Sequence, residues 1–367
     1  MVTTDSDYDR LAEQKAFNAT KAGVKGLVDA DVKELPQIFH APPHFLNGRP
    51  PAPDGDPDFS LPVIDLAGAR ADQDPEERKR IIKKIGDAST EWGFFQVVNH
   101  GVPASTLNEI RAGTHRFFDQ DVEVKKEYFS ADPMSKVVYT SNYGLYTAPV
   151  ANWGDLILFR MAPDPPAPEQ IPACIRQNVQ EFSDEMSKVG ELLLELMSEA
   201  LGLAPNHLKD EMGCAEGIGL ACHYYPPCPQ PELALGITHH TDIGFVTVLS
   251  QDHVGGLQVV HRDRWVDVPP VPGALVVNVG DMLQLISNDK FKSAEHRVIV
   301  NSTEPRISTV AFFGNGSTLK PRMYGPIKEL LSEGNPPIYQ EIAMEEFFFQ
   351  TYKKGFDGDS YLPRLKL

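Results

Sequence analysis

The chain has 367 residues, of which 41% are hydrophobic and 23% charged, a balance typical of soluble globular proteins. Its formal net charge of −17 repels phosphate backbones, and no dense Lys/Arg cluster offsets it, which excludes nucleic acid as a partner. The longest apolar runs, such as residues 274–279, are too short to cross a bilayer, and the polar N-terminus lacks a secretory pattern. We therefore expect a cytoplasmic protein with no membrane partner.

The first residues predict a helical and Pro-rich N-terminal arm, residues 1–60. Residues 1–35 carry a helix-compatible apolar pattern. From Pro36 onward the chain is rich in proline, which favours a linker or extended arm without regular structure.

An N-terminal α/β lobe is predicted next, over residues 61–170. LPVIDL at 61–66 and GFFQVVNHGV at 93–102 indicate strands. Between them, residues 74–92 indicate a helix, because Asp74 precedes Pro75 at the first turn and an apolar stripe follows. A long amphipathic helix near 178–202 belongs to a set of support helices over 171–214.

After residue 215 short β-branched runs alternate with turns. Seven strands at spacings near ten residues, without an intervening helical pattern, predict an antiparallel barrel or a jelly-roll sandwich over residues 215–320. Residues 321–367 are expected to form a C-terminal helical segment. The expected fold class is mainly β with helices (α+β).

The four cysteines predict reduced thiols rather than a disulfide framework. Cys174, Cys214, Cys222 and Cys228 are few for so long a chain. Two of them lie near His223 without forming a CxxC pair, so buried apolar thiols are favoured over a structural zinc site.

The stretch GITHHTDIGF at 236–245 holds the first chemical signal. Side chains alternate faces in an extended segment, so His240 and Asp242 point the same way while His239 points opposite. Taken alone, such a tripeptide is more often a hydrogen-bonded turn than a pair of metal ligands.

A third ligand candidate, His296, stands immediately before a later strand of the same β region. Two histidines and one carboxylate make the facial triad of non-haem Fe(II) oxygenases, which leaves three coordination positions open. The alternative for His296 is a surface histidine beside Arg297.

Ten residues after His296, Arg306 and Ser308 share one face of a strand. A buried arginine needs an anion, and its planar fork can grip a carboxylate in bidentate fashion while the serine adds a hydrogen bond. The alternative is a surface arginine on an edge strand.

Together these motifs resemble the plant Fe(II)/2-oxoglutarate-dependent dioxygenases. The likeness extends from residue 61 to about residue 349 and includes HYYPPCPQPELALG at 223–236, GDMLQLISNDKFKSAEHRV at 280–298 and WGFFQVVNHGVP at 92–103. The arm sequence KAFNATKAGVKGLVDADVKELPQIF at 15–39 further resembles the aminocyclopropane-carboxylate-oxidase homologues, a subgroup that includes hydroxylases of alkaloids, coumarin precursors and benzoxazinoid glucosides.

The resemblance implies a distorted jelly-roll in which His240, Asp242 and His296 bind Fe(II). It implies that Tyr225, Arg306 and Ser308 hold the distal carboxylate of 2-oxoglutarate. His223 stands where many relatives have Asn; its imidazole either donates a hydrogen bond toward this cosubstrate or changes the charge of the pocket near neutral pH.

The resemblance also implies a reaction with O2 that gives succinate and CO2, with ascorbate as a stimulant, in a monomeric enzyme. Tyr143, Thr238 and Phe312 are the expected substrate contacts, and aromatic walls suit a flat aromatic or heterocyclic metabolite. Core packing remains the alternative for Tyr143 and Phe312.

Three functions are compatible with these residues. The first is a 2-oxoglutarate-dependent hydroxylase or desaturase of a plant specialised metabolite. The second is an iron-dependent oxidase of the ethylene-forming type, which uses ascorbate without 2-oxoglutarate. The third is a non-catalytic jelly-roll binding protein, disfavoured because such a protein gains nothing from burying the triad and Arg306.

Overall fold

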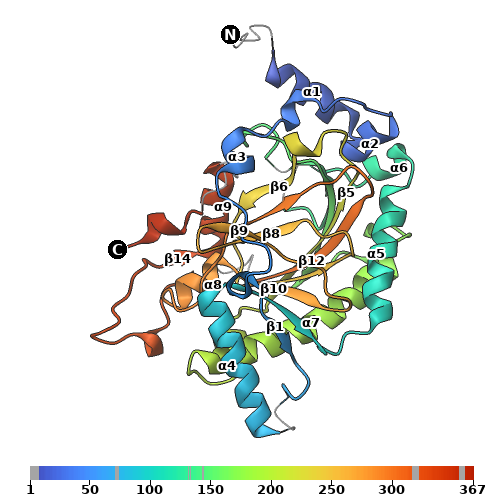
Figure 1. Ribbon diagram of the computed structural model, residues 1–367. Helices are drawn as coiled ribbons and strands as arrows, with labels where there is room; N and C mark the ends of the chain where they lie inside the picture. Colours follow the sequence, from blue (N-terminus) through green and yellow to red (C-terminus); the bar gives the residue numbers. More distant parts are fainter. Residues whose placement is uncertain are drawn as a thin grey trace.

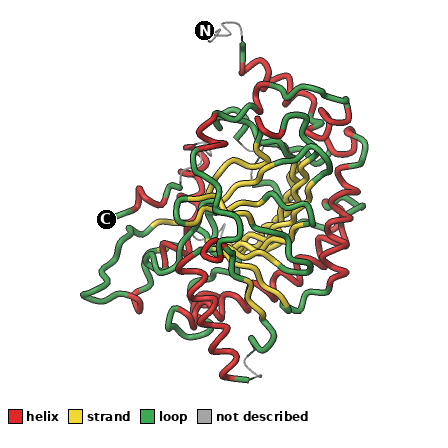
Figure 2. The backbone as a smooth tube through the Cα atoms, viewed as in Figure 1, coloured by secondary structure: helices red, strands yellow, loops and turns green. Residues whose placement is uncertain are grey.

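Two β-sheets face each other at the centre of the molecule, with helices arranged around the outside (Figure 1 and Figure 2). The structure is a computed structural model and describes residues 8–70, 74–130, 132, 134–142, 144–315, 322–354 and 360–367. Apolar side chains from both sheets, including Tyr225, Val276 and Val298, pack together between them. The α+β fold with its antiparallel core is therefore as the sequence predicts.

The larger sheet runs in the order β1-β2-β10-β7-β12-β5-β4-β3 and is antiparallel except between β1 and β2. Its strands are β1 (Val63–Asp65), β2 (Phe94–Val98), β3 (Val137–Thr140), β4 (Asp155–Ala162), β5 (Gly217–Tyr225), β7 (Val246–Gln251), β10 (Leu275–Val279) and β12 (Arg306–Gly314). The strands predicted at 61–66 and 93–102 thus join the same sheet as the predicted core.

The smaller sheet runs in the order β6-β11-β8-β9. Its strands are β6 (Leu235–His240), β8 (Leu257–His261), β9 (Arg264–Asp267) and β11 (His296–Ile299). A short pair, β13 (Met323–Tyr324) and β14 (Ile342–Ala343), lies in the C-terminal segment. Each strand predicted after residue 215 is present.

Three long helices cover the outer face of the larger sheet: α4 (Pro75–Glu91), α5 (Ala104–Phe118) and α7 (Arg176–Ala200). The predicted start of α4 is confirmed, because the Asp74 side chain accepts a hydrogen bond from the backbone N–H of Glu76 and Pro75 occupies the first turn. The amphipathic stripe of α7, including Phe182, Met186 and Leu193, is fully buried against the sheet.

The prediction of no helix within the β region was wrong. α8 (Asp281–Ile286) follows β10 directly, and its six residues are too few to display a helical period in the sequence. A further short helix, α6 (Val122–Lys126), follows α5, and α9 (Met344–Lys354) lies near the C-terminus.

The N-terminal arm is more ordered than the sequence indicates. It contains α1 (Arg10–Thr20), α2 (Gly23–Asp29) and, inside the Pro-rich segment, α3 (Pro43–Asn47). Pro43 sits in the first turn of α3, where a missing N–H does not interrupt the helix, so proline there is compatible with regular structure. The prediction of an irregular linker after Pro36 was therefore wrong for residues 43–47.

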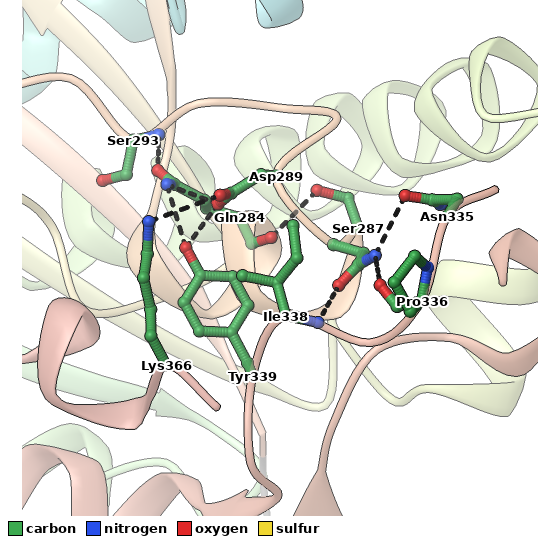
Figure 3. Close-up of polar contacts among 10 residues, drawn as sticks. Gln284, Ser287, Asp289, Ser293, Asn335, Pro336, Ile338, Tyr339 and Lys366 are labelled. Atoms are coloured by element: carbon green, nitrogen blue, oxygen red, sulfur yellow. Dashed lines mark hydrogen bonds and ion pairs between the residues drawn. The ribbon is translucent and has the colours of Figure 1, made fainter. Parts of the chain in front are cut away.

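The chain between α8 and β11 is tied to the C-terminal segment by polar contacts (Figure 3). Asp289 accepts hydrogen bonds from Gln284 (2.8 Å) and from the Tyr339 hydroxyl, and Asn288 accepts one from the backbone N–H of Ile338 (2.8 Å). Asn288 and Asp289 have φ values of 52° and 65°, a left-handed conformation that Asn and Asp tolerate better than most residues. These contacts fix the loop that leads into β11.

Candidate metal centre and cosubstrate site

Three side chains converge where β6 ends. His240 and His296 are directly paired across β6 and β11, and Asp242 follows β6 by two residues. Each histidine Nε2 lies 3.8 Å from Asp242 Oδ1, and one ligand atom from each residue lies within 4.8 Å of the others. Among the described residues no other set of three His, Cys, Asp or Glu side chains meets this condition.

Backbone carbonyls orient both imidazole rings. His240 Nδ1 donates to the Thr238 carbonyl (2.9 Å), and His296 Nδ1 donates to the Ala294 carbonyl (3.1 Å). Because a carbonyl oxygen can only accept, the proton stays on Nδ1 and each Nε2 presents its lone pair toward Asp242. Both rings are thus arranged as metal ligands.

Asp242 is held by two donors from the larger sheet. Its Oδ2 accepts hydrogen bonds from Thr247 Oγ1 (2.6 Å) and Asn278 Nδ2 (2.7 Å), which leaves Oδ1 directed at the histidines. Burial acts to raise the Asp242 pKa, but the neighbouring His296 and His240 and these two hydrogen bonds lower it below its usual value. The carboxylate is therefore ionised, as a metal ligand must be.

The donor set fits a divalent iron ion. Burial, together with the charge of His240, lowers the pKa of His296 to about 4, so that imidazole is neutral and able to coordinate at neutral pH. Two imidazole nitrogens and one carboxylate oxygen on one side of a common point match the facial arrangement that leaves coordination positions open.

A buried arginine lies on the larger sheet at the other side of the site. Arg306, 2% exposed, donates to the Gly255 carbonyl (2.5 Å), to Ser308 Oγ (3.0 Å) and to Gln251 Oε1 (3.2 Å), and its guanidinium lies 5.2 Å from the ring centre of Tyr225. It makes no ion pair with any carboxylate in the described part of the chain.

A buried guanidinium without an ion-pair partner, such as that of Arg306, is stabilised when an anion binds next to it. Its hydrogen-bond partners are all neutral, and burial lowers the pKa of Arg306 because the charged form is poorly solvated there; the charge of Asp252, which makes no ion pair with it, opposes this shift only in part. Ser308 and Tyr225 are equally buried, at 1% and 2% exposed, and both side chains hydrogen-bond around the same guanidinium. The three residues form a binding site suited to a carboxylate.

His223 is paired with Ser308 across β5 and β12, and its ring stacks on Tyr225 with centroids 5.8 Å apart. Burial and the charge of Arg306 lower the pKa of His223 to about 3. This environment favours a neutral imidazole at neutral pH, so of the two roles predicted for His223 it favours a hydrogen bond over a positive charge in the pocket.

One row of side chains crosses the inner face of the larger sheet toward the triad. Register places these residues side by side: Phe94, Asn278, Thr247, Phe312, Gly219 and Arg160. Cross-strand partners share a face, so Phe312 lies on the same side as Thr247, which bonds the triad carboxylate. A Cβ atom placed on Gly219 would meet nothing within 4 Å, so there is open space beside Phe312.

The remaining predicted residues fall in three places. Thr238 is buried on β6, where its N–H bonds Asn152 and its carbonyl orients His240. Tyr143 lies outside the described residues. His239 packs against the ring of Phe45 (4.8 Å), away from the triad.

Sequence reasoning missed Thr247, Asn278 and Gln251, which support the site. They are neutral residues in otherwise apolar strands, and only the pairing of β7 with β10 and β12 reveals that they share the inner face. All four cysteines are free thiols, and the one set of potential metal ligands among the described residues contains none of them. Burial raises the pKa of the Cys222 thiol to about 11, as expected for a buried apolar residue.

Comparisons with known proteins agree with this geometry. The 2OG-Fe(II) oxygenase superfamily model matches residues 219–315, and the model described as non-haem dioxygenase in morphine synthesis N-terminal matches residues 61–179. No helix in the described part of the chain is long and apolar enough to span a membrane.

Relatives and solved structures resemble nearly the whole chain. An Arabidopsis thaliana protein named 1-aminocyclopropane-1-carboxylate oxidase homolog 1 is 54% identical over 359 residues, covering 98% of this chain and 97% of its own. A Solanum lycopersicum homologue is 50% identical over 365 residues, covering 99% and 98%. The crystal structure of JOX2 with 2OG, Fe and JA superposes with a TM-score of 0.82 at 33% identity, covering 94% of this chain and 97% of that one.

The fold and the converging residues therefore define a non-haem iron oxygenase. The chain belongs to the 2OG-Fe(II) oxygenase superfamily and, within it, to the plant 1-aminocyclopropane-1-carboxylate oxidase homologues. It is a 2-oxoglutarate-dependent dioxygenase whose cofactor is Fe(II) and whose cosubstrate is 2-oxoglutarate.

Proposed function

We propose that this enzyme hydroxylates or desaturates a small plant specialised metabolite, with His240, Asp242 and His296 as its iron ligands. The observation that supports this proposal is the presence, inside one fold, of a three-ligand cluster with an ionised Asp242 carboxylate and of a buried Arg306 with no carboxylate partner among the described residues. Bound Fe(II) supplies the centre at which O2 oxidises 2-oxoglutarate to succinate and CO2 and the substrate to its product. For hydroxylation, one oxygen atom of O2 enters succinate and the other enters the substrate.

The chain's own residues would orient the reactants. Arg306, Ser308 and Tyr225 would hold the distal carboxylate of 2-oxoglutarate, which would give the guanidinium the ion-pair partner that it lacks among the described residues. His223, neutral and stacked on Tyr225, would contribute a hydrogen bond rather than a charge. Asn278 and Thr247 would keep the triad carboxylate directed at the metal.

The inner face of the larger sheet supports a flat, largely apolar substrate. Phe312 offers an aromatic wall next to Thr247, and the space beside Gly219 is open. Leu156 and Leu158 of β4 lie on the same face and are only partly buried. We include Thr238 and Tyr143 as substrate contacts by the same proposal, and ascorbate as a stimulant.

Two measurements test the proposal. Protein loaded anaerobically with Fe(II) should give a visible charge-transfer band when 2-oxoglutarate is added, and the band should be lost in His296→Ala. Lactones, phenylpropanoid thioesters, benzoxazinoid glucosides and indole alkaloids should then be screened for substrate-dependent succinate. Product formed with ascorbate but without 2-oxoglutarate would instead identify the ethylene-forming type of chemistry, and no band with no succinate would refute the proposal.

A further inference from the structure

The N-terminal arm crosses the outer face of the smaller sheet directly behind two of the metal ligands. Phe45 of α3 is 5% exposed, and its ring packs on His239 with centroids 4.8 Å apart. His239 precedes His240, the last residue of β6. The arm thus contacts the strand at the point where it ends in a ligand.

The same short segment binds both neighbours of the other ligand histidine. Arg297, 7% exposed, donates from Nη1 to the carbonyls of Phe45 (2.8 Å) and Leu46 (2.9 Å). Arg49 forms an ion pair with Glu295 at 2.5 Å. Residues 295 and 297 flank His296, the first residue of β11.

These contacts occur at the end of the edge strand β6, where it pairs with β11. His240 and His296 pair at the end of the β6–β11 ladder, and the register of that ladder shifts immediately beyond them. Strand ends have fewer ladder hydrogen bonds than strand centres, so they open at lower free energy. His296 is also paired with Val259 of β8, whereas β6 is the edge strand of the sheet, so the position of His240 relative to His296 depends on the end of a single ladder.

We propose that Phe45, Leu46 and Arg49 form a brace that positions the iron site. The brace links the end of β6 to the start of β11 from the side opposite the metal, through a ring contact on one strand and carbonyl and ion-pair contacts on the other. Arg297 is anchored in turn by Gln258 (2.8 Å) and lies 4.1 Å from the ring centre of Trp265. These residues touch no reacting atom and act only as positioning residues; the inference rests on the proposed ligand assignment.

The proposal is tested by measuring the metal affinity of the full chain, independently of its enzymatic activity. Co(II) is titrated into metal-free protein and followed by its visible absorption, and the thermal midpoint of the metal-free protein is recorded in parallel. Phe45→Ala is expected to raise the Co(II) dissociation constant about tenfold, the lower end of what losing an outer-shell partner costs. Phe45→Leu, which keeps apolar bulk, should recover most of that loss.

A matched control separates positioning from general loosening of the arm. Phe17 belongs to the same arm, and its ring packs on Phe39 (5.3 Å) rather than on a ligand strand. Phe17→Ala should lower the thermal midpoint yet leave the Co(II) dissociation constant within about twofold of the parent, since it leaves the outer shell of the site intact. Equal weakening by the Phe17 and Phe45 variants, or none by the latter, would overturn the brace.

Two further variants keep the test decisive. Arg49→Gln removes two partly exposed ion pairs, one to Glu295 (2.5 Å) and one to Asp263 (3.0 Å), of which only the first reaches a neighbour of His296. This variant should fold, so a loss of about threefold in Co(II) affinity is expected even if Phe45→Ala is insoluble. His296→Ala checks the ligand assignment itself. If it binds Co(II) like the parent, the proposed iron site fails; if it loses Co(II) while the brace variants do not, only the brace fails.

Discussion

Replacing Arg306 with glutamine should change cosubstrate binding and protein stability in different directions. The guanidinium is buried, donates to Gly255, Ser308 and Gln251, and has no carboxylate partner in the described chain. In the metal-free, ligand-free protein its charge is thus buried without an ion-pair partner and is only partly offset by hydrogen bonds and by Asp252, and a neutral amide of similar length removes that desolvation penalty. We expect Arg306→Gln to leave the free energy of unfolding within about 1 kcal/mol of the parent, or to raise it.

Binding of 2-oxoglutarate should fall steeply in the same variant. Removing one partner of a buried, hydrogen-bonded charge pair costs about 3 kcal/mol, which corresponds to about a 100-fold weaker dissociation constant. At a 2-oxoglutarate concentration about 100 times the parent dissociation constant, the ligand stabilises the parent by about 2.7 kcal/mol and the variant by only about 0.4 kcal/mol. The assay is urea unfolding with and without 2-oxoglutarate, at fixed Mn(II).

Arg78 supplies the contrasting control. It is 8% exposed, similar to Arg306 in burial, but it pairs with Glu195 (2.7 Å) and Glu199 on α7. Arg78→Gln should lose about 3 kcal/mol of stability and keep full 2-oxoglutarate affinity. A strongly destabilised Arg306→Gln protein, or one that binds 2-oxoglutarate as the parent does, would refute the anchor assignment.

Three further outcomes are expected. Asn278→Ala removes a 2.7 Å donor to Asp242 and should weaken Co(II) binding about tenfold or more in an absorption titration; unchanged binding would show that the hydrogen bond does not orient the ligand. The folded pKa of His223 is about 3, below the unfolded value near 6.5, so the stability present above pH 6.5 is lost as pH falls toward 3. Between pH 7.5 and 5, metal-free His223→Asn should therefore lose roughly 1 to 2 kcal/mol less free energy of unfolding than the parent in urea unfolding. Equal losses would contradict a neutral imidazole at this position. Gly219→Val should keep the parent's thermal midpoint and 2-oxoglutarate affinity while raising KM for the organic substrate; parental turnover would mean that the substrate lies elsewhere.

The convergence of the triad could be predicted from local sequence because it depends on strand periodicity. Alternation selects His240 over His239 as the partner of Asp242, and the structure places His239 against the arm instead. His296 required an inference across 54 residues, which its position at the start of a strand supported. Direct pairing of His240 with His296 then follows from the order of strands in the smaller sheet.

The supporting residues could not be predicted, because their roles depend on sheet order rather than on any local pattern. Thr247 and Asn278 become neighbours only when β7 pairs with β10. Phe45 lies 194 residues before His239, in a segment whose prolines suggest irregular structure. Tertiary contacts of this kind leave no periodic signal in the sequence, so they appear only once the chain is folded.

The proposed site draws on both sheets, so 2-oxoglutarate bound there would have a structural role beyond its chemistry. The histidine ligands belong to the smaller sheet, whereas Arg306 and Ser308 belong to the larger one. Asp242 already joins the two, since it follows β6 but is held by Thr247 and Asn278 of the larger sheet. A cosubstrate that contacts the metal at one end and Arg306 at the other would add a second link between the sheets. The free energy of 2-oxoglutarate binding would then also oppose separation of the two sheets. For this reason, comparing the free energy of unfolding with and without 2-oxoglutarate tests the role of Arg306 as its anchor.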